Sequence, residues 1–102
     1  DRNQLCILGE TEKFVRLDSL EEKWRAFGWH AVSVNGHSFS ELRQAFSQIG
    51  NTNGRPLAII ANTHKGMGVS FMQDNWQWHN RIPSPELFAR AREEVSLGFD
   101  NR

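Results

Sequence analysis

The feature that most constrains this chain is an unbroken apolar run, Leu57-Ala58-Ile59-Ile60-Ala61. A strand covered on one face alternates apolar and polar side chains, whereas a strand covered on both faces is apolar throughout. The run is also far too short to cross a bilayer. It therefore predicts a buried strand in a parallel sheet with helices on either side.

Two other short segments also predict strands. Residues 4–8, Gln-Leu-Cys-Ile-Leu, form an apolar run closed by Gly9, which is typical of a buried strand. In residues 29–34, Val32 and Val34 alternate with Ser33, and the Asn35-Gly36 pair that follows predicts a turn.

Three helices are predicted between and after these strands. Ser19 with Glu22, and Ser38 with Glu41, have the spacing of capping boxes, and Ser84-Pro85-Glu86 is a third helix start. Gly28 is placed to end the first helix with a left-handed residue. The apolar positions expected on the three helices are Leu20, Trp24 and Phe27; Leu42, Ala45, Phe46 and Ile49; and Leu87, Phe88, Ala91 and Val95. Strands and helices alternate up to a long loop over residues 62–83, so we expect an α/β fold with a doubly wound, mostly parallel sheet and flanking helices.

Charge and cysteine content narrow the class of protein. Twelve lysine and arginine residues balance twelve aspartate and glutamate residues, and a nucleic-acid-binding domain of this size would usually be more basic. No apolar segment is long enough for a membrane span, so we expect neither nucleic acid nor membrane as a partner. The single cysteine, Cys6, fits a reducing compartment, and we expect a cytoplasmic protein in which this thiol is packed and inert.

The chain of 102 residues is one domain at most. It begins with Asp1 rather than methionine, and its first segment already has the character of a buried strand. We therefore expect further sequence upstream.

Ligands in open α/β sheets bind outside the carboxyl ends of the strands. The polar groups expected there are Asn3 near the first predicted strand, the Asn35-Gly36-His37 turn after the second, and the loop over residues 62–79 after the third. In that loop, Lys65-Gly66-Met67-Gly68 combines a cation with two glycines, which suits either an anion site or a flexible turn. The four histidines lack the spacing of a zinc site. His79 follows Trp78, and it suits either a ligand contact or a hydrogen-bonded loop position.

Several blocks of residues are more specific together than singly. They are Asp1-Arg2-Asn3-Gln4-Leu5 with Gly9, Phe27-Gly28-Trp29, Val34-Asn35-Gly36-His37, Ala61-Asn62-Thr63, Lys65-Gly66-Met67-Gly68-Val69-Ser70-Phe71, Trp78-His79 and Pro83. In order and spacing these blocks resemble the N-terminal, diphosphate-binding module of transketolases, especially the separate subunit of split transketolases. The resemblance covers residues 1–102 and corresponds to the second half of that module.

The resemblance implies that thiamine diphosphate is anchored through a divalent metal such as Mg²⁺ or Ca²⁺. Asn3 matches the metal-binding asparagine of the family, and the backbone carbonyl of Leu5 matches the carbonyl ligand. Oxygen donors of this kind suit Mg²⁺. The Gly-Asp-Gly segment that supplies the family's carboxylate ligand is missing from this sequence, and we expect it upstream if the chain belongs to a working enzyme.

Two loop residues also acquire roles by this matching. His79 corresponds to the histidine that lies beside the diphosphate and reaches toward the substrate, and it is the expected catalytic residue. Lys65 lies in the loop that lines the diphosphate, where a lysine neutralises phosphate charge. Gly36 is expected to supply a positive φ in its turn. The sequence departs from the family at Arg2, at Met67 and at residues 80–82; the last change affects how His79 is presented.

The implied activity is transfer of a two-carbon ketol unit between sugar phosphates. Because the Gly-Asp-Gly segment and the carboxylate of the pyrimidine-binding module are missing, we expect the chain to be inactive alone. Its expected partner is that module, in the same or a separate chain, within an oligomeric assembly. Two alternatives stay open: a non-catalytic α/β assembly module derived from this fold, and a sister thiamine enzyme such as deoxyxylulose-phosphate synthase or dihydroxyacetone synthase.

Overall fold

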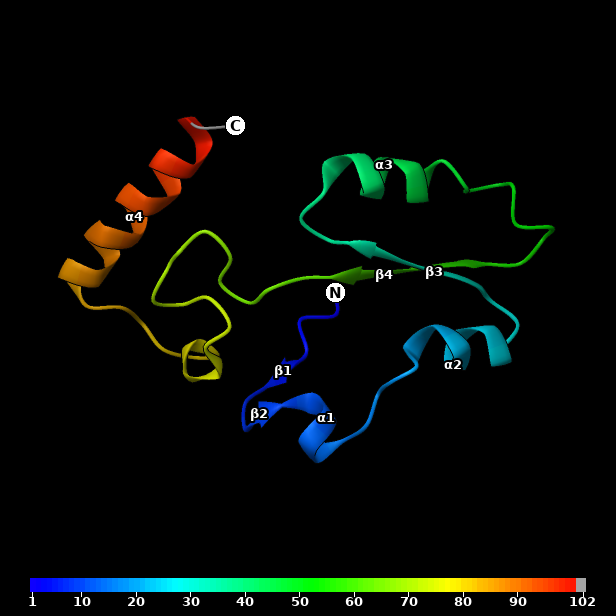
Figure 1. Ribbon diagram of the computed structural model, residues 1–102, viewed down its shortest axis with the longest axis horizontal. Helices are drawn as coiled ribbons and strands as arrows, with labels where there is room; N and C mark the ends of the chain where they lie inside the picture. The colour runs from blue at the N-terminus through cyan, green and yellow to red at the C-terminus, as the bar shows by residue number, and fades with distance from the viewer. Residues whose placement is uncertain (101–102) are drawn as a thin grey trace. The chain divides into compact units, whose positions relative to one another are not determined.

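A computed structural model of the chain describes residues 1–100. These form two compact units. The first comprises residues 1–4 and 11–63, and the second comprises residues 5–10 and the segment from residue 64 onward. Figure 1 shows the elements of each.

A pair of parallel strands forms the centre of the first unit. β3 (His30–Asn35) and β4 (Leu57–Asn62) pair in register from His30 opposite Leu57 to Asn35 opposite Asn62. Helix α3 (Phe39–Phe46) connects them, and helix α2 (Leu20–Ala26) lies on the other side of the strands (Figure 1). Ala31, Ala45 and Ile60 are buried between strands and helices. The expected parallel arrangement with helices on both faces is confirmed.

The helix starts read from the sequence are also confirmed. The hydroxyl of Ser19 accepts a hydrogen bond from the backbone N–H of Glu22, and that of Ser38 accepts one from Glu41. These bonds satisfy N–H groups that have no partner inside the helix. The Glu41 carboxylate reaches back to the N–H of Asn35 at 2.7 Å and so joins the helix to the end of β3. Gly28 follows α2 with φ of +87°, as expected for the residue that ends a helix.

The predictions for helix length and for one strand were wrong in part. α3 ends at Phe46, so Ile49 lies beyond it and is exposed. Residues 4–8 do not form a buried strand. Leu5–Cys6 (β1) and Gly9–Glu10 (β2) form a short antiparallel hairpin, and Ile7 and Leu8 at its tip are 51% and 63% exposed. An apolar run alone does not distinguish a central strand from a hairpin whose neighbour follows at once.

Arg2, upstream of this hairpin, makes the contact with the sheet that the predicted strand was expected to make. It forms a single parallel bridge with Asn62: its N–H donates to the carbonyl of Ala61 at 2.8 Å, and its carbonyl accepts from Thr63 at 3.2 Å. The short helix α1 (Thr11–Phe14), which the sequence did not predict, belongs to the same unit.

The second unit contains the hairpin, the long loop and helix α4 (Pro85–Asp100). Within the loop, Trp76–Trp78 form a single 3-10 turn, η1. The Ser84 hydroxyl accepts from the N–H of Leu87 at the start of α4. A hydrogen bond between the Ser84 side chain and the Glu86 carboxylate lowers the pKa of Glu86. Within residues 1–100, no helix combines the length and the apolar character needed to cross a membrane.

Candidate functional site

The first group of candidate residues lies at the carboxyl end of the parallel strands. Asn35 and Asn62 are the last residues of β3 and β4 and are partners in register. Because Arg2 pairs in parallel with Asn62, the next residue, Asn3, continues past the same end of the sheet. Asn3 is half-buried. This is the end at which open α/β sheets bind ligands.

Gly36 in the following turn has a role other than the one expected. Its φ lies outside the left-handed region, so a positive φ does not explain the glycine. Instead the N–H of Gly36 donates to the carbonyl of Asn62 at 2.7 Å. A Cβ at this position would overlap Cγ2 of Thr63 and lie 3.1 Å from both the Ala61 Cβ and the Asn62 carbonyl oxygen. Close approach of the turn to the end of β4 therefore requires glycine.

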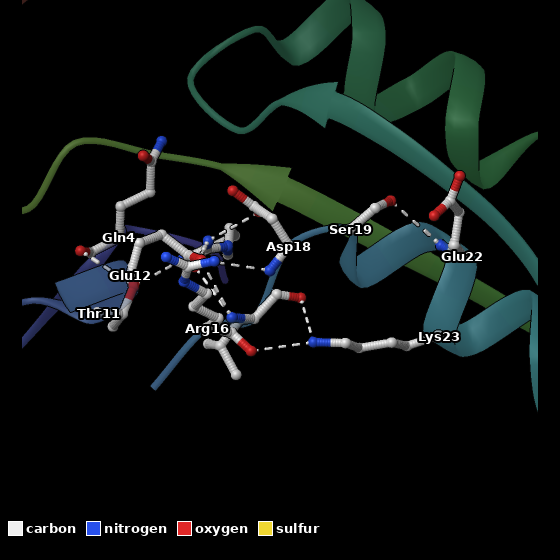
Figure 2. Close-up of polar contacts among 10 residues, drawn as sticks. Gln4, Thr11, Glu12, Arg16, Asp18, Ser19, Glu22 and Lys23 are labelled. Carbon is white, nitrogen blue, oxygen red and sulfur yellow. Dashed lines mark hydrogen bonds and ion pairs between the residues drawn. The ribbon is translucent and has the colours of Figure 1, made fainter. Parts of the chain in front are cut away.

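The side chain of Arg2 fixes the segment that carries Asn3. Arg2 is only 7% exposed, and its guanidinium donates to Thr11 at 2.9 Å, to Glu12 at 2.6 Å and to Asp18 at 3.0 Å. Figure 2 shows the three acceptor residues together. The carboxylate of Glu12 also accepts from the N–H of Leu17. A buried guanidinium needs such partners, and this network explains both the presence of α1 and the placement of Arg2.

The backbone changes direction between the two expected metal ligands. Gln4 has φ of +62°, a left-handed conformation that is uncommon outside glycine and is frequent at functional sites. Its carbonyl accepts from the N–H of Thr11 at 2.9 Å. Leu5 is the first residue of β1, opposite Glu10, and is half-buried, as is Cys6 beside it. The strained backbone at Gln4 is a signal that the sequence did not contain.

The loop that carries Lys65 is closed by local hydrogen bonds. The N–H of Asp74 donates to the carbonyl of Lys65 at 2.8 Å, and the Asp74 carboxylate lies 3.1 Å from Nδ1 of His64. Gly66 has φ of +70°, and a Cβ there would lie 2.7 Å from the Met72 carbonyl oxygen. The glycine is therefore required by both its backbone and its neighbour. Lys65 itself is half-buried.

His79 directly follows η1 and is exposed. Its backbone N–H donates to the carbonyl of Trp76 at 3.0 Å. The preceding Trp78 is half-buried, and its indole N–H donates to the carbonyl of Phe71 at 3.0 Å. An exposed imidazole next to a fixed tryptophan is open to a ligand.

A link between the loop and α4 was missed from the sequence. The carboxylate of Glu94 accepts from the backbone N–H and the hydroxyl of Ser70, and these bonds, with a smaller contribution from Arg90, lower the pKa of Glu94. The spacing of Arg90 and Glu94 in the sequence predicts that the two residues pair on one helix face. Ser70, which both residues contact, lies 24 residues before Glu94, and no local sequence pattern connects it to them.

The expected site residues are thus divided between the two units. Asn3 belongs to the first unit, whereas Leu5, Lys65 and His79 belong to the second. Convergence of Asn3 and Lys65 on one ligand stays a prediction.

Comparison with known proteins decides the family. Residues 1–101 match the family described as "Transketolase, thiamine diphosphate binding domain". The chain belongs to this family.

Relatives of this transketolase-family chain include proteins named as transketolase subunits and proteins named simply transketolase. One of the subunits of apulose-4-phosphate transketolase from Phocaeicola vulgatus is 40% identical over 96 residues, which cover 94% of this chain and 34% of that protein. The 6-deoxy-6-sulfo-D-fructose transketolase subunit SqwG of Clostridium sp. is 39% identical over 95 residues, which cover 93% of this chain and 34% of that protein. Human transketolase is 42% identical over 74 residues, which cover 72% of this chain and 11% of that protein. The chain spans about a third of the length of the two bacterial relatives.

The fold agrees with the family. A crystal structure of transketolase from Campylobacter jejuni superposes with a TM-score of 0.83 at 24% identity, covering 94% of this chain and 15% of that chain. The similarity confirms the partial α/β thiamine diphosphate-binding fold.

Proposed function

We propose that this chain is part of a thiamine diphosphate-dependent transketolase that transfers a two-carbon ketol unit between sugar phosphates. The observation that carries the proposal is the family match over residues 1–101. Relatives whose names include transketolase support it. When bound, the thiamine cofactor supplies the electron sink for this chemistry. The residues of this chain hold and orient the diphosphate side of the cofactor.

Asn3 is proposed as a metal ligand through its side-chain oxygen, and Leu5 through its backbone carbonyl. The place of Asn3 at the carboxyl end of the parallel strands supports its role. Both groups are hard oxygen donors, which fit Mg²⁺ or another divalent cation such as Ca²⁺. Among residues 1–100, histidine, cysteine and acidic side chains form no cluster of three suited to a metal.

Lys65 and His79 are proposed to act on the anionic part of the site. Lys65 is half-buried and precedes the tight turn at Gly66, which restricts the backbone of this segment. Its ammonium group is proposed to neutralise the charge of the diphosphate. His79 is exposed and directly follows a turn fixed by hydrogen bonds. Its imidazole is proposed to contact the diphosphate and the substrate, where it holds or moves a proton.

The proposed enzyme needs more than this chain. A pyrimidine-binding module, in the same or a separate chain, is the proposed partner in an oligomeric assembly, and sugar phosphates are the proposed substrates. Two relatives are named as subunits, which supports a separate partner. The single cysteine is consistent with a cytoplasmic location.

Substitution of Asn3 by alanine tests the proposal in the assembled enzyme. We expect affinity for Mg²⁺ with thiamine diphosphate, measured by isothermal titration calorimetry, to fall roughly tenfold or more. Asn51→Ala is the matched control, because Asn51 is exposed in a loop of the same unit. This control should leave the affinities for Mg²⁺ and for thiamine diphosphate unchanged.

Other outcomes separate the alternatives. Unchanged affinities in Asn3→Ala would remove Asn3 from the metal site. Turnover of a ketose phosphate such as xylulose 5-phosphate by the isolated chain would contradict its proposed dependence on a partner. An assembled protein that binds no thiamine diphosphate would favour the non-catalytic module.

A further inference from the structure

Arg90 and Glu94 form an ion pair on α4 whose position matters more than its own strength. The guanidinium Nε donates to the carboxylate of Glu94 at 2.8 Å, and the two side chains are 54% and 24% exposed. Exposed pairs of this kind add little to stability. Arginine before glutamate is also the less favourable order on a helix. The pair is therefore better explained by what it contacts beyond the helix.

Both members of the pair bind Ser70 in the loop. Glu94 accepts from the backbone N–H of Ser70 at 2.5 Å and from its hydroxyl at 2.8 Å. Nη2 of Arg90 donates to the same hydroxyl oxygen at 2.7 Å. Because every contact involves a charged donor or acceptor, these hydrogen bonds are stronger than neutral ones. The hydrogen bonds from Ser70 lower the pKa of Glu94, so its carboxylate stays ionised to a lower pH than that of a free glutamate.

A chain of contacts continues from Ser70 to the candidate histidine. Arg90 lies over the ring of Phe71, with 5.1 Å from Cζ to the ring centroid. Phe71 packs edge-to-face with Trp78 at 5.4 Å between centroids, and its carbonyl accepts from the Trp78 indole at 3.0 Å. Trp78 ends η1, and His79 follows it. Each contact restricts the next residue along this path.

We propose that Glu94 and Arg90 are positioning residues for His79. They hold Ser70 and Phe71 against α4, and Phe71 in turn fixes Trp78, so that the imidazole of His79 is presented in one place. This inference rests on the proposed role of His79 toward the cofactor and substrate. It assigns to two helix residues a function in the reaction that they perform through His79.

The test compares Glu94→Ala in wild-type and His79→Ala backgrounds of the assembled enzyme. We expect Glu94→Ala to lower kcat about tenfold through misplacement of His79, with little change in the KM for the sugar. In the His79→Ala background the same substitution should have no further effect. Glu94→Gln should recover part of the loss, because its amide oxygen still accepts from Ser70. Glu93→Ala, the adjacent exposed position of α4, is the matched control and should leave kcat unchanged.

Hydrogen exchange of the Trp78 indole N–H, followed by NMR with ¹⁵N-labelled tryptophan, gives a readout independent of activity. We expect exchange to become about tenfold faster in Glu94→Ala and unchanged in Glu93→Ala. An equal loss of kcat in both backgrounds, or unchanged indole exchange, would overturn the positioning role while leaving the role of His79 intact. Wild-type kcat in His79→Ala would instead overturn the role of His79 itself, and the positioning role with it.

Discussion

Replacing Gly36 with alanine adds one methyl group where the structure leaves no room for it. The new Cβ would overlap Cγ2 of Thr63 and lie 3.1 Å from the Ala61 Cβ and the Asn62 carbonyl oxygen. The turn cannot move away without stretching the 2.7 Å hydrogen bond from the Gly36 N–H to Asn62. The substitution therefore strains the carboxyl end of the sheet, next to Asn3.

The expected loss of stability follows from two opposing effects. Inserting a methyl group into a packed site costs typically about 1–3 kcal/mol. Alanine also restricts the unfolded chain, which offsets about 0.4–1 kcal/mol. We expect Gly36→Ala to lower the free energy of unfolding by about 1–2 kcal/mol. Adding Thr63→Ser, which removes the overlapping methyl group, should recover about half of this loss because the contacts with β4 remain.

Urea unfolding of the purified protein that carries this chain measures the effect. Gly98→Ala is the matched control: Gly98 is helical, without a positive φ, and has open space around its Cβ position. It should raise stability by about 0.5–1 kcal/mol. Wild-type stability in Gly36→Ala, or simple additivity of the Gly36→Ala and Thr63→Ser effects, would refute the steric explanation.

Two further predictions concern charged residues. Arg2→Met should destabilise the protein by about 2–3 kcal/mol, less than the roughly 3–5 kcal/mol for a fully buried pair because Asp18 is 70% exposed; a urea midpoint equal to that of wild type would contradict the network. Because the pKa of Glu94 is lowered from 4.5, its contribution to stability should be present at neutral pH and disappear as the pH falls below that value. An NMR titration should place the Glu94 midpoint below the ordinary value for glutamate. Ser70→Ala keeps the backbone N–H that donates to Glu94 and removes the hydroxyl, so it should raise the midpoint in part; a midpoint insensitive to Ser70→Ala would remove the hydroxyl from this effect.

The sequence predicted the parts of the fold that depend on near neighbours. Ser19 and Ser38 cap helices because their partners lie three residues away. The run at residues 57–61 forms a parallel strand, as its consecutive apolar side chains predicted. The same local information placed the Asn35-Gly36 turn after a strand and Lys65 in a glycine-containing loop. Resemblance to a family, rather than pattern, supplied their chemical roles.

Patterns that extend over a few residues failed where a distant segment decides the outcome. Residues 5–6 pair with residues 9–10 in a hairpin, and Arg2, rather than the predicted strand, forms the parallel bridge with the end of β4. Gly36 is needed because Thr63 approaches it, not because of its own backbone. Neither contact can be predicted from the neighbouring residues in the sequence.

By itself, the sequence determined where α2, α3 and α4 begin, which two segments form the parallel strands, and the kinds of chemical group that follow those strands. Only the tertiary structure decided which groups meet: the guanidinium of Arg2 with Glu12, and the carboxylate of Glu94 with Ser70. The physical reason is the distance along the chain over which each interaction acts. Helix caps and side-chain periodicity act within one or two turns, whereas packing and buried charge depend on residues brought together by the folded chain.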